Sequence, residues 1–182
     1  MSALSANHSP PSNWVQRHIG LIQPGARVLD LACGSGRHTR LLHAHNYSVL
    51  AADHDLSRMS ELRNTDRIEL RLVDLETQHW PFQTEKFAGI IVTNYLYRPH
   101  MQSLVSSLKE DGVLIYATFA AGNEAFGRPD NPDFLLRPNE LNDTFGKHLF
   151  VIACEQVTEH GAVPAVRQRI CATGMTHPAA SS

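Results

Sequence analysis

A short glycine-rich turn carries the clearest chemical signal in the sequence. It contains Gly34 and Gly36, and Asp30 ends the apolar run that precedes it. Glycine lacks a Cβ and accepts positive φ angles, so a ligand can lie directly against the backbone of such a turn. The dinucleotide fingerprint G-x-G-x-x-G requires a third glycine, but Thr39 stands at that position. A carboxylate beside the turn repels a pyrophosphate and favours a cationic ligand.

The segments around this turn alternate between strand-like and helix-like patterns, which is typical of an α/β fold. Continuously apolar runs bounded by turn residues indicate buried parallel strands, expected at 27–31, 47–52, 68–73, 87–93 and 113–119. Helices are expected at 37–45, from Asp55 to about 63, and at 99–109, the last ended by Asp111 and Gly112. The turn therefore lies at the carboxyl end of the first strand, where open parallel sheets bind ligands.

The alternation of strand-like and helix-like segments stops after residue 119. A short helix and two extended segments are expected late in the chain, at 138–145, 149–157 and 165–173. Gly161 and Pro164 lie between the last two, which predicts an antiparallel hairpin. The predicted fold class is α/β: a Rossmann-like, mostly parallel sheet of seven strands, with helices on both faces and a C-terminal antiparallel hairpin.

The stretch 120–136 is rich in Gly, Pro and Asn and is long for a connection. Loops of that length are usually functional or disordered. Because it follows the fifth expected strand, it should lie at the ligand edge of the sheet. We hypothesise a lid over the substrate, with Phe126 and Phe134 as apolar cover and Arg128 as an anion contact.

Composition favours one globular domain in a reducing compartment. The chain has 182 residues, of which 42% are hydrophobic and 19% charged. The domain is expected at 12–174, between flexible polar ends at 1–11 and 175–182. No apolar run approaches the roughly 20 residues that span a bilayer, and the N-terminus lacks the pattern of a secretory signal. Three scattered cysteines agree with a cytoplasmic location.

The charge balance and the spacing of the histidines limit which kinds of partner are expected. The 16 basic and 18 acidic residues nearly balance, and no window is dominated by Lys and Arg, which argues against a nucleic-acid partner. His43 and His45 are two residues apart and do not share a helix face, so no metal site is expected. A small-molecule substrate is favoured, and the choice between monomer and homodimer stays open.

The turn resembles the first motif of the class I S-adenosylmethionine-dependent methyltransferases, D-x-G-x-G-x-G. Residues 30–36 read Asp-Leu-Ala-Cys-Gly-Ser-Gly, so Ala32 replaces the first glycine. The resemblance covers about 25–120 well and the remainder more loosely. S-adenosylmethionine has a sulfonium and an amino group and no phosphate, in agreement with the acid beside the turn. The resemblance implies this cofactor, bound at Asp30, Ala32, Gly34 and Gly36.

The resemblance also implies cofactor contacts after the later strands. Asp53 would hold both ribose hydroxyls, because a carboxylate accepts two donors at once, and His54 stands beside it. Asp74 would accept from the adenine amino group, and Leu75 would offer its backbone N–H to a ring nitrogen. Asn94, after the fourth strand, would face the methyl group.

The residues after the fourth strand are the expected catalytic residues, Asn94 and Tyr95, in the role of orienting the substrate. Methyl transfer from a sulfonium needs alignment more than a strong base, and alignment can supply roughly 7 to 11 kcal/mol. The run 94–97 lacks the two prolines of family members that act on DNA adenine or glutamine, which disfavours those substrates. The loop 33–37 and the run 134–141 are similar to the small tellurite-resistance-type methyltransferases.

The sequence thus predicts an S-adenosylmethionine-dependent methyltransferase that methylates a small molecule. Two alternatives remain open: a non-catalytic module that binds the cofactor on the same fold, and a methyltransferase acting on RNA or protein. A nicotinamide-dependent oxidoreductase is a further rival, and the missing third glycine argues against it.

Overall fold

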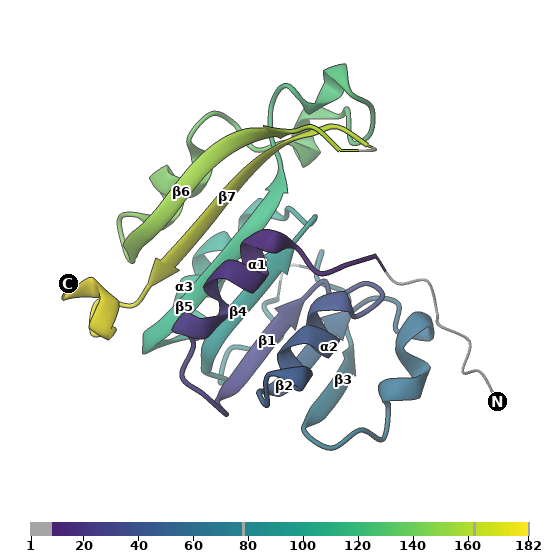
Figure 1. Ribbon diagram of the computed structural model, residues 1–182, viewed down its shortest axis with the longest axis vertical. Helices are drawn as coiled ribbons and strands as arrows, with labels where there is room; N and C mark the ends of the chain where they lie inside the picture. The colour runs from purple at the N-terminus through teal and green to yellow at the C-terminus, as the bar shows by residue number, and fades with distance from the viewer. Residues whose placement is uncertain (1–8, 78, 162, 182) are drawn as a thin grey trace.

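One mixed sheet organises the chain. The structure, a computed structural model, describes residues 9–77, 79–161 and 163–181. Within these residues, seven strands lie in the order β3-β2-β1-β4-β5-β7-β6 (Figure 1). The strands are β1 (Arg27–Leu31), β2 (Ser48–Asp53), β3 (Ile68–Leu72), β4 (Phe87–Thr93), β5 (Leu108–Phe119), β6 (Phe150–Glu159) and β7 (Ala165–Thr173).

The pairing of the strands has two parts. The pairs among β1 to β5 are parallel, whereas β7 runs antiparallel to both β5 and β6. Strands β6 and β7 therefore form the predicted hairpin at one edge. The predicted fold class, a mostly parallel Rossmann-like sheet ending in an antiparallel hairpin, is confirmed.

Helices cover both faces of the sheet. The α-helices are α1 (Asn13–His18), α2 (Arg37–Ala44), α3 (Met101–Ser107) and α4 (Glu140–Phe145). Short 3-10 segments lie at Ile19–Leu21, Ser57–Leu62, Arg98–His100, Asn123–Ala125, Pro132–Phe134 and Pro178–Ala180. Alternate strand residues point to opposite sides, so Leu29 packs with the α3 and α4 side chains and Val28 with those of α1 and α2. Figure 1 shows α1 and α2 together on one face.

Two predicted boundaries are wrong. The helix expected at 99–109 is α3, which ends at Ser107. Asp111 and Gly112 lie inside β5 rather than before it. Pairing decides this, because Leu108 already pairs with Phe87 of β4 and a register shift takes up the extra residues. The helix expected from Asp55 is a kinked 3-10 segment, although the Asp55 carboxylate does accept the N–H of Ser57.

The ends of the chain differ from each other. Residues 1–8 of the expected flexible N-terminus lie outside the described residues. At the other end, His177 is buried and its ring Nε2 lies 2.9 Å from the carbonyl oxygen of Leu21, so the segment after 174 packs against the domain. Among the described residues, no helix is long and apolar enough to cross a membrane.

Candidate functional site

The turn between β1 and α2 has the backbone that its glycines predict. Gly34 and Gly36 have φ of 56° and 75°, and Ala32 is also left-handed at 52°. A Cβ added at Gly34 would meet nothing within 4 Å, whereas one at Gly36 would lie 2.5 Å from the Cε of Met59. Gly34 therefore borders open space that a ligand can enter, and Gly36 permits the close packing of the turn on its neighbours.

Asp53 ends β2 directly beside this turn. The backbone N–H of Gly34 donates to its Oδ2 at 2.8 Å, and the N–H of Asp55 donates to its Oδ1 at 3.1 Å. The ring Nδ1 of His54 lies 3.0 Å from the same Oδ1. These contacts fix the carboxylate while leaving lone pairs for a ligand hydroxyl.

A cavity of about 770 Å³ opens in front of Asp53. Its walls come from the ends of β1 to β4, where parallel sheets bind ligands. Most of the predicted cofactor residues line this first cavity, which is formed by Ala32, Asp53, His54, Leu72, Val73, Asp74, Leu75, Glu76, Asn94 and Tyr95. Leu72, Val73 and Glu76 were not predicted, and Leu72 is 69% exposed, so it offers apolar surface to a ligand.

Asp30 is not brought to the wall of the first cavity. Its side chain lies beneath the turn, 2% exposed, and accepts a hydrogen bond of 2.6 Å from the hydroxyl of Thr39. Burial raises the carboxyl pKa from 3.8 to about 7, although Thr39 and Arg37 oppose the shift. Asp30 therefore supports the turn from below, and of these two acids only Asp53 lines the first cavity.

Two tyrosine hydroxyls hold the segment after β3, where the adenine is expected to bind. The Tyr95 hydroxyl donates to the Leu75 carbonyl at 3.2 Å, and the Tyr97 hydroxyl donates to the Glu76 carbonyl at 3.2 Å. The Asp74 carboxylate accepts the N–H of Glu76 at 2.9 Å. Burial raises the pKa of Tyr95, so this phenol stays protonated and holds the segment after β3 in place.

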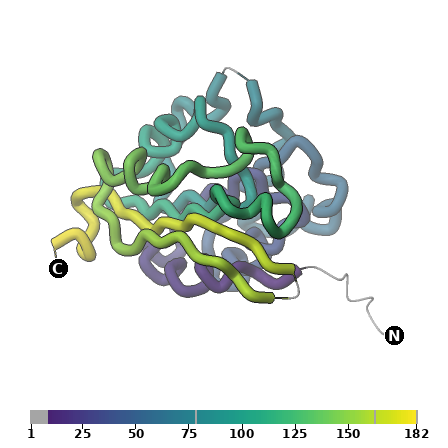
Figure 2. The backbone as a smooth tube through the Cα atoms, turned by 90° about the horizontal axis from the view of Figure 1, so that it is seen from above, coloured from purple at the N-terminus to yellow at the C-terminus, as the bar shows by residue number. Residues whose placement is uncertain are grey.

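A second cavity of about 470 Å³ adjoins the first at Asn94. Its lining is Pro10, Pro11, Ser12, Asn13, Trp14, Arg17, Arg37, Thr93, Asn94, Ala117, Glu159, His160, Gly161, Arg167 and Arg169. The N-terminal segment and the tip of the β6–β7 hairpin thus meet above the sheet, as Figure 2 shows from above. Of the two predicted catalytic residues, Asn94 lines both cavities and Tyr95 only the first.

A buried histidine joins the elements around the second cavity. The His38 Nε2 accepts the N–H of Ser12 at 3.1 Å, so Nδ1 carries the proton and points at the Thr93 hydroxyl, 3.3 Å away. Burial and the nearby Arg37 lower the His38 pKa to about 3, so the ring is neutral at ordinary pH. The neutral ring holds the N-terminal segment against the end of β4.

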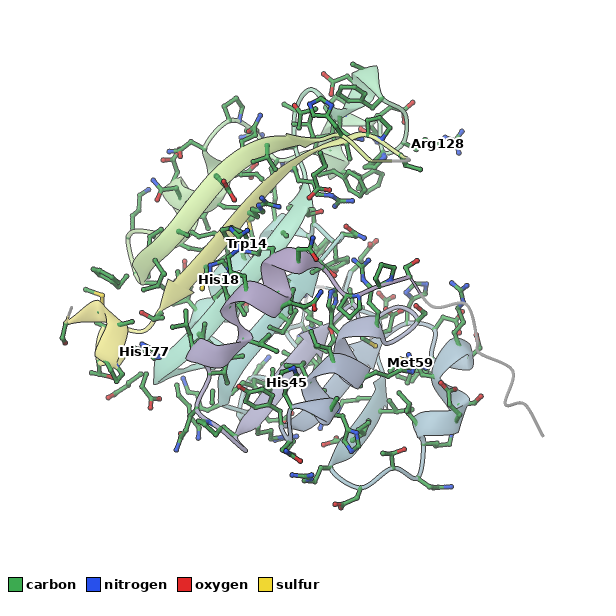
Figure 3. The ribbon with its side chains drawn as sticks, viewed as in Figure 1. Trp14, His18, His45, Met59, Arg128 and His177 are labelled. Carbon is green, nitrogen blue, oxygen red and sulfur yellow. The ribbon has the colours of Figure 1, made fainter. Side chains whose placement is uncertain are left out.

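The hypothesised lid contributes to neither cavity in the part of the chain that the structure describes. Residues 120–136 are closed at their base, where the N–H of Ala121 donates to the Leu136 carbonyl at 2.9 Å. Phe126 and Phe134 are 44% and 52% exposed. Figure 3 shows Arg128 at the outer end of this segment, pointing away from the sheet.

Comparison with known proteins agrees with this arrangement. A family described as a methyltransferase domain matches residues 28–112, which include the turn, Asp53, Asp74 and Asn94. The resemblance to class I methyltransferases is confirmed. No protein of curated function matches the sequence closely.

Solved methyltransferases share the whole fold at low identity. TehB from Haemophilus influenzae superposes with a TM-score of 0.78 at 19% identity, over 92% of this chain and 64% of TehB. This chain thus spans less than two thirds of TehB. The 1,6-didemethyltoxoflavin-N1-methyltransferase of Burkholderia thailandensis, solved with 1,6-didemethyltoxoflavin and S-adenosylhomocysteine bound, gives a TM-score of 0.65 at 16% identity, over 88% of this chain and 74% of that one. The N-methyltransferase NodS of Bradyrhizobium japonicum, solved with S-adenosylhomocysteine, gives 0.65 at 16%, over 87% and 86%.

This methyltransferase fold contains residues that the sequence did not single out. Arg37 follows the turn directly, and Arg167 and Arg169 alternate along β7. The signal available for the last two was their spacing, since residues two apart on a strand share a face. The described residues contain no cluster of three or more His, Cys, Asp or Glu suited to a metal ion.

Proposed function

We propose that the protein is an S-adenosylmethionine-dependent methyltransferase whose acceptor is a small molecule. The observation that carries the proposal is Asp53, a carboxylate fixed by the Gly34 N–H at the mouth of the first cavity. The methyltransferase-domain match over 28–112 supports the same reaction.

The residues of the first cavity fit an adenosyl cofactor. Asp53 would accept the ribose hydroxyls, and Leu72 and Leu75 offer apolar surface to the adenine beside the Asp74 carboxylate. The open space over Gly34 leaves room for the amino acid part. When bound, the cofactor supplies a sulfonium methyl group that an acceptor displaces in line.

The protein's own contribution is alignment and exclusion of water. Asn94 borders both cavities and can orient an acceptor, while the half-buried Tyr95 stays protonated and His38 stays neutral. Holding two reactants in line can supply roughly 7 to 11 kcal/mol of the barrier. The chemistry therefore needs no strong base from this chain.

A small acceptor is favoured by the second cavity, whose volume of about 470 Å³ lies in the usual range for small-molecule sites. Two structural neighbours are named as N-methyltransferases, and one of them was solved with 1,6-didemethyltoxoflavin bound. The alternatives are a methyltransferase for RNA or protein and a non-catalytic cofactor-binding module.

The test is thermal unfolding with S-adenosylhomocysteine or NAD. At 100 times its Kd, the nucleoside should add about 2.7 kcal/mol of stability, which is several degrees of Tm, and NAD should add none. Asp53→Asn should weaken the nucleoside about 10- to 100-fold, since a hydrogen bond to a charged group contributes roughly 1.5 to 3 kcal/mol. Asp55→Asn is the matched control, because that carboxylate lies outside the cavity and asparagine can still cap Ser57.

Each outcome decides between the candidates. Stabilisation by NAD, or equal affinity in the Asp53 variant, would overturn the cofactor assignment. Binding without release of S-adenosylhomocysteine across metabolite, RNA and protein panels would favour the non-catalytic module. Turnover of RNA alone would replace the small-molecule acceptor.

A further inference from the structure

The second cavity concentrates positive charge in a chain whose formal net charge is −2. Four arginines line it, Arg17, Arg37, Arg167 and Arg169, against the single carboxylate of Glu159. They come from α1, α2 and β7, so the fold collects them from distant parts of the sequence. A concave site with this imbalance attracts anions.

Two of these arginines are held rigidly. The Arg167 Nε donates to Glu159 at 2.9 Å, and its guanidinium lies 4.1 Å from the centre of the Phe119 ring. The Arg169 Nε donates to Glu155 at 2.9 Å, and its guanidinium lies 4.8 Å from the Trp14 ring. Both side chains are 18% exposed. Guanidinium groups fixed in this way lose little side-chain freedom when an anion binds to their remaining N–H groups.

Arg37 is different, because no carboxylate in the described part of the chain lies within salt-bridge distance of it. Its guanidinium donates to the Pro10 carbonyl at 3.4 Å, and the side chain is half-buried. Burial and then the positive charge of Arg167 lower its pKa. Arg37 has no carboxylate partner of its own in the described residues and is repelled by the charge of Arg167, so an anion placed between the two side chains would stabilise both.

The arginine cluster is coupled to the site of methyl transfer. Arg167 donates through an Nη to the side-chain oxygen of Asn94, the residue shared by the two cavities. An acceptor bound to Arg37 and Arg167 would therefore lie next to the end of β4, where the cofactor cavity opens.

We propose that the second cavity binds a small acceptor through an anionic oxygen group, a carboxylate or a phosphate, held by Arg37 and Arg167. This inference rests on the proposed function, since it names the class of acceptor at the same site. The anionic group anchors the acceptor and leaves its nucleophilic atom free to face the methyl group.

The first test needs no cofactor and no known substrate. Thermal unfolding is measured in sodium succinate and in sodium phosphate, each against sodium chloride of equal ionic strength. We expect at least one of the two anions to raise the Tm of the wild-type protein beyond chloride, and whichever is stronger indicates the carboxylate or the phosphate. Absence of any shift beyond chloride for both anions would overturn the proposal.

Variants locate the binding. Arg37→Gln should remove the anion-dependent shift and, since it relieves repulsion by Arg167, should leave the Tm in chloride at or above that of the wild type. Arg128→Gln is the matched control, because this exposed arginine lies on the hypothesised lid (Figure 3). Loss of the shift in Arg128→Gln but not in Arg37→Gln would place the anion on the lid and refute the cavity.

Turnover gives the second test. Candidate acids are compared with their neutral amides in release of S-adenosylhomocysteine. The acid should be preferred at least tenfold in kcat/KM, and Arg37→Gln should remove that preference mainly through KM, with unchanged affinity for S-adenosylhomocysteine. Preference for the amide, or stabilisation by a short RNA above either small anion, would overturn the inference while leaving the cofactor assignment intact. If S-adenosylhomocysteine itself does not bind, the proposed function fails instead.

Discussion

Replacing Asp30 with asparagine should change how the stability of the protein depends on pH. The carboxyl pKa is raised by burial from 3.8 to about 7, so the folded protein keeps a proton that the unfolded chain has lost between about pH 4 and pH 7. Through this group alone, the free energy of unfolding falls as the pH rises across that interval. The pKa difference corresponds to roughly 4 kcal/mol over the whole interval.

His38 acts in the opposite direction over an overlapping range. Burial lowers its pKa from 6.5 to about 3, so the unfolded chain binds a proton that the folded protein does not. Its contribution to the free energy of unfolding therefore rises with pH between about 3 and 6.5, by up to roughly 5 kcal/mol. Between about pH 4 and 6.5 the contributions of Asp30 and His38 to the free energy of unfolding change in opposite directions and largely cancel. The stability of the wild-type protein therefore shows neither contribution.

Urea unfolding followed by circular dichroism at pH 4.5, 5.5 and 6.5 separates the two contributions. Relative to the wild type, Asp30→Asn should gain roughly 1.4 kcal/mol of stability for each pH unit of increase, and His38→Gln should lose about as much. Because differences between variant and wild type are compared, the other carboxylates drop out. A difference that stays constant with pH in Asp30→Asn would mean that this buried carboxyl remains ionised, and the reasoning from burial would be refuted.

Three further predictions concern the turn and its neighbour. Ala32→Gly should raise the free energy of unfolding by up to about 1 kcal/mol in urea titration, because the left-handed φ of 52° strains alanine and the entropy of the unfolded glycine offsets part of the gain. Gly36→Ala should lower the Tm more than Gly25→Ala, since both have positive φ but only the former meets Met59; equal losses would contradict the clash with that side chain. Asn94→Gly keeps a residue that tolerates φ of 55° and removes the Arg167 contact, so kcat should fall roughly 10- to 100-fold with little change in Tm.

The strands and the turn could be predicted because their signals are local. Continuous apolar runs indicated β1 and β4, and the glycines with positive φ marked the site. The start of β5 could not be predicted, because Leu108 joins the strand through its pairing with Phe87. This pairing overrides the local signals, which are the helical pattern up to residue 109 and the turn residues Asp111 and Gly112. Local signals do not show which strand will lie alongside.

The position of each acid relative to the first cavity depends on how far along its strand it lies, because the register places Asp30 and Asp53 on the same side of the sheet. Asp30 stands between Ala51 of β2 and Ile91 of β4 in the register, in the middle of the sheet and under Thr39 of α2. Asp53 is the last residue of β2 and therefore lies at the carboxyl end of the sheet, where the first cavity opens. The sequence shows an acid near a strand end in both cases, but of the two only Asp53 lines the first cavity.

Asn94 lies where the two cavities meet. Its left-handed backbone turns the chain at the end of β4, and its N–H is fixed by the Ala117 carbonyl of β5 at 3.0 Å. Asn94 thereby lines both the first cavity, which contains Asp53, and the second cavity, which contains the arginines. In-line displacement needs donor and acceptor to approach from opposite sides of the transferred methyl group, and in the proposed reaction the cofactor would occupy the first cavity and the acceptor the second. The two arginines that would hold the acceptor come from α2 and β7, and residues of both the N-terminal segment and the hairpin line the second cavity around them.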